Sequence, residues 1–306
     1  MKKVLLSVII PAYNEEKRIG VTLADLKRFF SEKDFPYEVI VVSDGSTDGT
    51  ADLVREFAKG FPALKIVDNK ENRGKGYAVR CGMLEAAGEY RLFMDADNSV
   101  TIDTVEPFIE EAQRDGADVT IGSIALSDSE VVEHNGWHRR VFGSMSKLLV
   151  RAVATPGIYD TQRGFKLFTE KAAKAIFPRQ KINRFGFDIE LLVIARLHGF
   201  AIRELPVSWN NPAGSKVDLK AYVDSFTELW RIYGNMLRGA YDPAHSARAR
   251  RAGAEKASLL VLFLGEFPAL FSRLVREILT SKIRLQEIKR SLKDSFSGRR
   301  GMILEE

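Results

Sequence analysis

Short apolar runs alternate with longer amphipathic segments through the first 125 residues of the chain. Apolar runs bounded by turn residues predict strands, whereas apolar positions spaced three or four apart predict helices. The predicted strands cover 4–10, 37–46, 64–69, 90–97 and 117–123, and the first is expected to end at Pro11. The predicted helices cover 15–33, 48–61, 74–88 and 103–116. This alternation predicts an α/β fold, a mostly parallel sheet with helices on both faces.

The second half of the chain has a less regular order of elements. Its predicted helices cover 138–154, 187–200 and 219–237, its predicted strand covers 201–209, and 160–177 reads as a loop, a short strand and a helix. Residues 242–256 are predicted to be a linker, followed by one or two basic amphipathic helices to about Phe296. We therefore divide the chain into an α/β domain at 1–237 and a linker with a basic helical region at 238–306.

Polar loops follow four of the predicted strands. Their sequences are PAYNEE (11–16), SDGSTDGT (43–50), NRGKG (72–76) and DADNS (95–99). In parallel sheets, ligands bind beyond the carboxyl ends of the strands. We therefore expect all four loops to lie on one rim of the sheet.

Asp95 and Asp97 stand one residue apart at the end of the strand 90–97. Alternate side chains of a strand point to the same side, so both carboxylates are expected to reach one ligand. Close carboxylates repel each other unless a cation shares them, and oxygen ligands of this kind suit Mg²⁺ or Mn²⁺. Alternatively, one aspartate caps the next helix and the other is solvated.

Asp44 and the loop 72–76 carry weaker signals on the same rim. Asp44 follows a strand, where it is expected to accept hydrogen bonds from a nucleoside. Alternatively, it is simply a turn-forming residue, since Asp, Gly, Ser and Thr favour turns. The loop 72–76 places Arg73 and Lys75 at a helix start, where backbone N–H groups and a cation favour a diphosphate. It matches neither the three-glycine dinucleotide pattern nor the P-loop.

The net charge of +5 is concentrated in the C-terminal region. Residues 238–306 hold 14 Lys and Arg against 8 Asp and Glu, so the preceding residues are close to neutral. A basic amphipathic helix is typical of binding to a membrane surface. The alternative is a helical hairpin that packs on the first domain or on a second subunit. Aromatic residues do not interleave with the basic ones, which argues against nucleic-acid binding.

In combination, four motifs resemble the inverting family 2 glycosyltransferases, which bind nucleotide-sugars on a GT-A fold: SVIIPAYNEE, VIVVSDGSTDGT, NRGKGYAVRCGM and FMDAD. Further along, DTQRGFKLF, FGFDIELL and PVSWNNPAGSKV resemble one branch, the dolichyl-phosphate glucosyltransferases and their polyprenyl-phosphate glycosyltransferase relatives. The resemblance covers about 4–233. It implies metal-dependent transfer of a hexose, with glucose favoured, from a UDP-sugar to polyprenyl or dolichyl phosphate, with Mg²⁺ or Mn²⁺ as cofactor.

The resemblance implies a donor site on the first part of the rim. Residues expected to flank the nucleoside are Pro11, Tyr13, Asn14 and Glu15. Asp44 is expected near the uracil, Lys75 beside the nucleotide, and Asp95 near the ribose and the metal. Asp97 is expected to bind the metal that holds the diphosphate. Two further residues are expected on a loop that closes over the donor, Ser215 and Lys216.

The resemblance also implies an acceptor side. Residues expected to face the sugar and the acceptor phosphate are Asp160, Gln162 and Arg163, while Asp188 and Glu190 are expected near the reacting centre. A lipid phosphate is already anionic, so arginines matter more than a base. If the acceptor is a hydroxyl, Asp160 or Asp188 is the candidate base. The alternative role for Asp188 is the N-cap of the helix 187–200.

Two departures from the branch concern the acceptor. The predicted strand before Ile124 ends in GSI where the branch has GSR, so a phosphate-facing arginine is missing, and Arg139 and Arg140 are candidate replacements. The chain also has neither a signal peptide nor the run of roughly 18 apolar residues that the branch's usual membrane anchor needs. Two other hypotheses therefore stay open, a family 2 enzyme with a soluble acceptor and a nucleotide-sugar-binding membrane scaffold without turnover.

The single cysteine, Cys81, excludes an internal disulfide and fits a reducing compartment. Together with the basic C-terminal region, this predicts a cytoplasmic protein that is peripheral on the inner face of the membrane.

Overall fold

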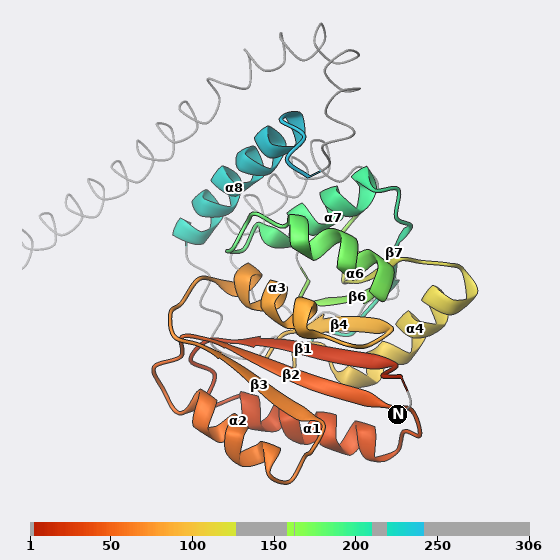
Figure 1. Cartoon of the computed structure of the whole chain (residues 1–306). Helices are drawn as coiled ribbons and strands as arrows, with labels where there is room; N and C mark the ends of the chain where they lie inside the picture. The colour runs from red at the N-terminus through yellow and green to blue at the C-terminus, as the bar shows by residue number, and fades with distance from the viewer. Residues whose placement is uncertain (1–2, 127–157, 162, 210–218, 242–306) are drawn as a thin grey trace, which may run out of the picture. The chain divides into compact units, whose positions relative to one another are not determined.

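The computed structural model describes residues 3–126, 158–161, 163–209 and 219–241. Within them a seven-stranded sheet carries helices on both faces (Figure 1). The strands are β1 (Leu6–Ala12), β2 (Tyr37–Asp44), β3 (Leu64–Asn69), β4 (Tyr90–Met94), β5 (Val119–Ser123), β6 (Phe165–Thr169) and β7 (Ile202–Pro206). The helices are α1 (Ile19–Ser31), α2 (Thr50–Ala58), α3 (Lys75–Glu85), α4 (Val105–Arg114), α6 (Glu170–Ile176), α7 (Phe187–Leu197) and α8 (Leu219–Leu237), with single 3-10 turns η1 (Ile102–Thr104) and η2 (Phe177–Arg179).

The strand order is β3-β2-β1-β4-β6-β5-β7, and the predicted mostly parallel sheet is confirmed. Strands β1 to β4 are mutually parallel and β7 is parallel to β5, whereas β6 is antiparallel to β4 and β5. Because β6 runs the other way, its first residue, Phe165, pairs with the last residue of β4, Met94. The segment that precedes β6 therefore reaches the rim where β1 to β4 end.

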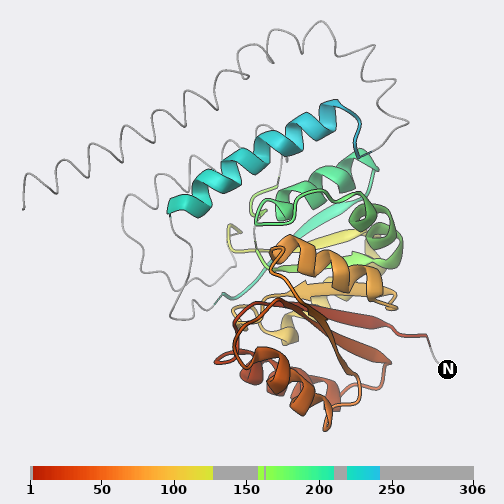
Figure 2. The same ribbon diagram turned by 60° about the vertical axis from the view of Figure 1, so that its left-hand side comes forward.

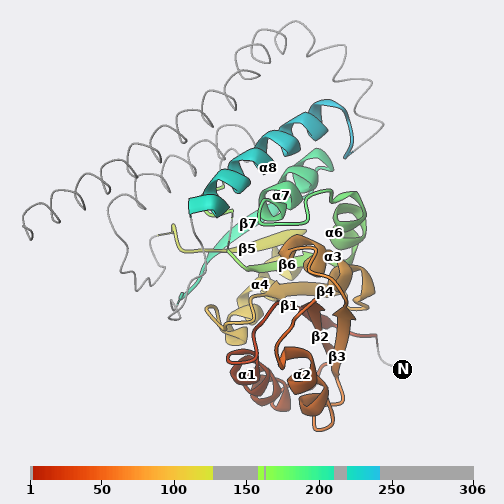
Figure 3. The same cartoon turned by 90° about the vertical axis from the view of Figure 1, so that its left-hand side faces the viewer.

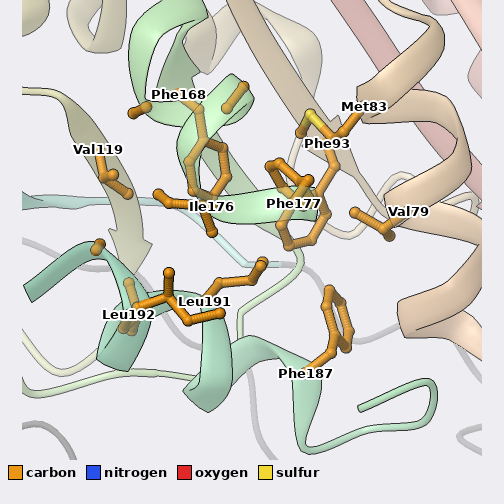
Figure 4. Close-up of a cluster of buried hydrophobic side chains, with 14 of the residues drawn as sticks. Val79, Met83, Phe93, Val119, Phe168, Ile176, Phe177, Phe187, Leu191 and Leu192 are labelled. Atoms are coloured by element: carbon orange, nitrogen blue, oxygen red, sulfur yellow. The ribbon is translucent and has the colours of Figure 1, made fainter. Parts of the chain in front are cut away.

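Alternating side chains of the sheet build one core on each face. Val8 and Ile10 of β1 pack in a cluster with residues of α1, α2 and α4, whereas Ile9 between them packs with residues of α3, α6 and α7. Figure 4 shows part of the second core, where Phe187 of α7 lies beside Phe93 of β4 with their ring centroids 5.7 Å apart. Complete burial of such apolar side chains stabilises each by about 1.5–3 kcal/mol.

Helix α7 is apolar nearly all round because it is covered on opposite sides. Its residues from Phe187 to Ala195 are all buried. The sheet and α6 cover one side, and α8 packs along another (Figure 2 and Figure 3). Leu229 and Ile232 of α8 belong to the same core as α7. This packing fixes the start of α7 relative to the ends of the strands.

Two strand ends at the rim differ from the prediction in ways that affect the site. β1 continues through Pro11 to Ala12, because its pairing with β4 stops at Ile9 and a strand with a neighbour on one side only tolerates proline. β4 ends at Met94, so the acidic pair that follows lies in a turn rather than on the strand.

The predicted helix at 138–154 and the predicted elements beyond 241 lie outside the described residues, so the division at 237 stays a prediction. None of the described helices has the length and apolar character needed to cross a membrane.

Candidate active site

The four polar loops that follow β1 to β4 lie on one rim of the sheet, as predicted, because these strands are parallel neighbours. Two further segments join them there. The residues before β6 arrive through its antiparallel direction, and the first turn of α7 is in contact with β6 through an ion pair between Lys166 and Asp188.

Asp44 anchors the loop between β3 and α3. Its buried carboxylate accepts hydrogen bonds from the backbone N–H groups of Arg73, at 3.1 Å, and Gly74, at 2.7 Å. Gly74 has a φ of 108°, a conformation that other residues rarely adopt. A carboxylate has about four lone-pair positions, so Asp44 keeps acceptor capacity for a ligand while it shapes this loop.

The loops after β1 and β2 are joined by hydrogen bonds. The side-chain oxygen of Asn14 accepts from the backbone N–H of Thr47 at 2.8 Å, and the N–H of Glu15 donates to the Thr50 hydroxyl at 2.8 Å. Asn14 adopts a left-handed φ of 54° at this contact. The loop that was expected to flank the nucleoside is therefore held by its neighbour on the rim.

Three predicted nucleoside residues have different surroundings. Pro11 is buried in β1, whereas the Tyr13 side chain is 44% exposed and available to stack on a flat ligand. The Glu15 carboxylate accepts two hydrogen bonds from the guanidinium of Arg18, both at 2.6 Å. Arg18 was not singled out from the sequence, and it lies in the rim between Glu15 and Asp97, 3.8 Å from the Asp97 carboxylate.

Asp95 and Asp97 occupy the turn after β4, where Asn98 has a left-handed φ of 55°. The expectation that strand alternation orients them is wrong, because the strand ends before Asp95. The turn nevertheless leaves both carboxylates partly exposed on the rim, at 28% and 25%. Asp97 accepts one backbone hydrogen bond, from the N–H of Ser99 at 3.1 Å. The alternative in which one aspartate caps the next helix finds no support, since neither η1 nor α4 has a side-chain cap.

Lys75, the first residue of α3, connects the loop 72–76 to the turn that holds Asp95 and Asp97, called the acidic turn from here on. Its Nζ lies 2.5 Å from Oδ1 of Asp95. Burial opposes the charge of this ammonium, but the carboxylates of Asp95, Asp188 and Asp97 outweigh that effect and raise the pKa of Lys75. Lys75 therefore remains a cation across the physiological range.

The pair Asp160 and Arg163 forms a second charged feature on the rim. Nε of Arg163 donates to the buried Asp160 carboxylate at 2.9 Å, and the guanidinium lies over the ring of Trp209, 4.6 Å from its centroid. Glu204 of β7 fixes the backbone of this segment by accepting from the N–H groups of Tyr159 and Asp160, at 2.8 and 2.9 Å. Arg163 is thus held in one orientation.

Ile124, which replaces the expected arginine, follows β5 beside this pair. Its backbone N–H donates to Oδ2 of Asp160 at 3.3 Å. Ile124 packs against the core with its apolar side chain. The position therefore contributes a backbone contact to Asp160 rather than a cation.

Asp188 contacts Lys166, a residue that the sequence did not single out. The two side chains form a buried ion pair, and Nζ of Lys166 also donates to the backbone carbonyl of Arg163 at 2.5 Å. The alternative that Asp188 is an N-cap is wrong, because α7 begins at Phe187 and its N-cap is Gly186. Burial raises the pKa of Asp188, and the nearby ammonium groups of Lys166 and Lys75 offset part of that effect.

Glu190, two residues after Asp188 in the first turn of α7, is occupied by structural contacts. Its carboxylate accepts from the backbone N–H groups of Lys181 and Ile182, at 3.0 and 2.8 Å, and from the hydroxyl of Tyr241 at 2.8 Å. These bonds join the turn before α7 to the residues after α8. Glu190 therefore supports the position of α7.

Comparison with known proteins identifies the family. Residues 7–177, more than half of the chain, match the family model described as glycosyl transferase family 2. The chain belongs to glycosyl transferase family 2. The dolichyl-phosphate beta-glucosyltransferase of Dictyostelium discoideum is 37% identical over 250 residues, which cover 78% of this chain and 76% of the relative. The Homo sapiens protein of the same name is 35% identical over 250 residues, which cover 77% of each chain.

Solved structures support the predicted GT-A fold of this family 2 glycosyltransferase. Glucosyl-3-phosphoglycerate synthase from Mycobacterium tuberculosis, solved with Mn²⁺, UDP-glucose and phosphoglyceric acid, superposes with a TM-score of 0.58 at 18% identity. The match covers 76% of this chain and 80% of that one. Mannosyl-3-phosphoglycerate synthase from Rubrobacter xylanophilus gives a TM-score of 0.56 at 14% identity, over 77% of this chain and 74% of that one.

The acidic turn of this glycosyltransferase fits a divalent cation. Asp95 and Asp97 offer two partly exposed carboxylates with free acceptor positions, the oxygen ligands that Mg²⁺ and Mn²⁺ prefer. Within the described ranges, no group of three or more His, Cys, Asp or Glu side chains is arranged to hold a metal ion. A bound ion is therefore expected to take its remaining ligands from substrate phosphates and water.

Five predicted residues lie outside the described part of the chain, and their roles stay predictions. They are Ser215 and Lys216 of the loop expected to cover the donor, Gln162 of the acceptor side, and Arg139 and Arg140, the candidate replacements for the missing arginine.

Gly164 allows the segment before β6 to approach the acidic turn. Its backbone carbonyl accepts from the N–H of Asp95 at 3.0 Å, and a Cβ at this position would overlap the Asp95 carboxylate. We expect Gly164→Ala to displace this carboxylate and weaken metal-dependent UDP binding about 10-fold or more, as disturbed support of metal ligands does. Calorimetric titration of UDP with and without Mn²⁺ measures the effect.

The matched control for this variant is Gly234→Ala in α8, where an added Cβ meets no described heavy atom within 4 Å beyond its chain neighbours and its own helix backbone. It is expected to leave UDP binding unchanged. If Gly164→Ala and the wild-type protein bound UDP equally well in the presence of Mn²⁺, the expectation that Asp95 holds the metal would be contradicted.

Proposed function

We propose that this family 2 glycosyltransferase transfers glucose from UDP-glucose to a polyprenyl phosphate such as dolichyl phosphate, with inversion at the anomeric carbon. Support comes from relatives named dolichyl-phosphate beta-glucosyltransferase, which are 35–37% identical over most of this chain. Support for an anionic acceptor comes from the described site itself.

The observation that carries the proposal is the position of Arg163. It stands one residue before Gly164, whose carbonyl accepts a hydrogen bond from Asp95 in the acidic turn. Asp160 and Trp209 fix its guanidinium on two sides. An arginine held in this way offers a preformed, planar site for a phosphate next to the proposed position of the departing diphosphate.

On the donor side, the residues of the rim have complementary tasks. Tyr13 and Asp44 would hold the nucleoside, and Lys75 would donate to the diphosphate. Asp95 and Asp97 would hold a Mg²⁺ or Mn²⁺ ion, which when bound supplies positive charge to the leaving diphosphate. Lys75 is fixed by Asp95 before substrate binds, so little reorganisation is needed as negative charge develops.

In the proposed reaction, the bond between the glucose anomeric carbon and the diphosphate oxygen breaks as an acceptor phosphate oxygen forms the new bond from the opposite side. A phosphate monoester loses its second proton near pH 6, so this oxygen is anionic at neutral pH and needs no base. Asp160 therefore orients Arg163 instead of taking a proton. Asp188 supplies negative charge near the sugar, where positive charge develops.

We further propose that the basic region at 238–306 brings the enzyme to anionic membrane lipids. This region holds more Lys and Arg than Asp and Glu. Each basic residue near an anionic lipid surface contributes about 1 kcal/mol to membrane binding. This would place the site beside a lipid acceptor at the inner face of the membrane.

The proposal is tested by incubating the purified full-length protein with UDP-glucose and Mn²⁺ in three parallel reactions. One contains a polyprenyl phosphate in detergent micelles, one contains soluble phosphorylated sugars and glycerates, and one contains no acceptor. UDP release and glucosylated lipid are measured together. We expect UDP release to be stimulated at least about 10-fold by the lipid alone, with formation of glucosylated lipid.

The other outcomes separate the remaining hypotheses. Stimulation by a soluble acceptor with indifference to the lipid would replace the lipid acceptor by a soluble one. UDP-glucose binding without release in any reaction would favour the scaffold without turnover.

A further inference from the structure

Lys166, the second residue of β6, is a fully buried cation with the apolar residues Phe165, Leu167 and Phe168 beside it in the strand. Its neighbours Phe165 and Leu167 point into the core on the side of α1 and α4, whereas Phe168 points to the side of α6 and α7. Strand alternation places Lys166 on the same face of the sheet as Phe168, and Lys166 lies two residues closer to the rim. Its ammonium thereby meets the first turn of α7.

The fold alone does not explain a lysine at this place. Removing an ammonium group from water is costly, and buried ion pairs are often no more stabilising than apolar side chains of similar volume. The surrounding core is apolar, since Lys166 pairs with Phe93 across the sheet and its Nζ lies 5.2 Å from the centroid of that ring. An apolar residue would suit this core, so the charge points to a task in the site.

The contacts of Lys166 connect two candidate site residues from different elements. Its Nζ donates to the backbone carbonyl of Arg163, in the segment before β6, and forms the ion pair with Asp188 at the start of α7. Among the described residues, Lys166 is the cation in direct contact with Asp188. One ammonium therefore sets the spacing between the acceptor-side arginine and the buried carboxylate.

We propose that Lys166 is a positioning residue for glucosyl transfer, which holds Asp188 as an anion at the sugar and ties it to the segment that carries Arg163. The proposal rests on the proposed function, because it assigns Asp188 to the reacting sugar. The Lys166 side chain is fully buried, whereas 5% of the Asp188 side chain is exposed. Asp188 is therefore the member of the pair that can face the substrate.

The charges that face Asp188 determine how it responds to the loss of Lys166. They come from three elements, namely Lys166 of β6, Lys75 of α3, and Asp95 in the turn after β4, whose negative charge opposes ionisation. Burial and the charge of Asp95 both raise the pKa of Asp188. Without the Lys166 ammonium, Lys75 alone would oppose this effect. Asp188 would then hold a proton to higher pH.

The test compares full-length wild-type protein with Lys166→Met in the lipid transfer assay across pH 5–9. In the variant we expect kcat at pH 7 to fall by about 10²-fold, the magnitude typical of one lost electrostatic contact in a catalytic site. The acidic limb of its pH profile should move upward by about one unit or more. UDP affinity in the presence of Mn²⁺ should stay within about threefold of wild type, because the contacts of Lys166 among the described residues are with Asp188, Arg163 and Phe93, none of which is a donor residue.

Leu167→Ala is the matched control. Leu167 is equally buried on the same strand but faces the other core, so its truncation destabilises the fold without touching Asp188. We expect a lower melting temperature and an unshifted pH profile. An unshifted profile in Lys166→Met, or a kcat within about twofold of wild type, would overturn the role of Lys166.

If Lys166→Met does not fold, Asp188→Asn and the double variant Lys166→Met with Asp188→Asn decide the question, because the double variant leaves no unpaired buried charge. Equal kcat in Asp188→Asn and in the double variant supports the proposal that Lys166 acts through Asp188. A further loss of kcat in the double variant overturns that proposal.

The proposed function and the role of Lys166 are tested by different outcomes. Absence of lipid-dependent transfer in the wild-type protein counts against the proposed function, whereas transfer that survives the loss of Lys166 counts only against this inference.

Discussion

Asp97→Ala is expected to lower the rate of glucose transfer by about 10³-fold and to abolish the metal dependence of UDP binding. Asp97 is a partly exposed carboxylate in a turn, and its recorded contacts are one backbone N–H and a guanidinium 3.8 Å away. Its loss therefore removes a metal ligand with little cost to the core. Transfer kinetics and calorimetric titration of UDP with and without Mn²⁺ measure the two effects.

Asp103→Ala serves as the control for Asp97→Ala. Asp103 lies six residues later in η1, where its carboxylate is 56% exposed and 3.7 Å from Arg28. This variant is expected to transfer glucose at the wild-type rate, since exposed ion pairs contribute little. Wild-type turnover in Asp97→Ala with an unchanged melting temperature would refute the metal site.

Arg163→Met is expected to reduce kcat/KM for the polyprenyl phosphate by about 10²- to 10³-fold, the usual loss when one partner of a buried charged contact is removed. UDP affinity should be nearly unchanged, because within the described part of the chain the side chain of Arg163 contacts Asp160 and Trp209, neither of which is a donor residue. Arg163→Lys is expected to recover only part of the activity, since a lysine keeps the charge but loses the planar fork. Initial rates at varied lipid concentration give both parameters.

Arg203→Met provides the matched arginine control. Arg203 stands on β7 with its side chain 55% exposed, 3.7 Å from Glu111 and away from the rim. It should leave both kcat/KM and UDP affinity unchanged. A selective loss of UDP affinity in Arg163→Met, with the lipid dependence intact, would move Arg163 to the donor side.

Several parts of the site were predictable because strand direction constrains loops. The loops after β1 to β4 could be assigned to one rim because consecutive parallel strands end at the same edge. The glycine-opened helix was also predicted, and α3 indeed begins at Lys75 after Gly74. The resemblance implied that Asp160 and Arg163 face the same sugar and acceptor phosphate, and the structure brings the two side chains into contact.

Other parts could not be predicted because they depend on distant segments. Lys166 reads in the sequence as a polar position of a half-buried strand, and only the packing of α7 on β6 turns it into a buried partner of Asp188. Arg18 reads as a surface residue before α1, yet the turn after β4 brings Asp97 toward it. The sequence analysis did not single out Lys166, and the one signal that could have found it is a single charge among apolar residues.

The sequence by itself determined the alternation of strands and helices, the rim that carries the loops, and the family, because these follow from local periodicity and short motifs. The tertiary structure alone decided which charges meet. It set the antiparallel direction of β6, which carries Arg163 and Gly164 to the acidic turn, and it joined Lys166 to Asp188 across 22 residues. The physical reason is that ion pairing and burial depend on distances between segments far apart in the chain, which no local pattern encodes.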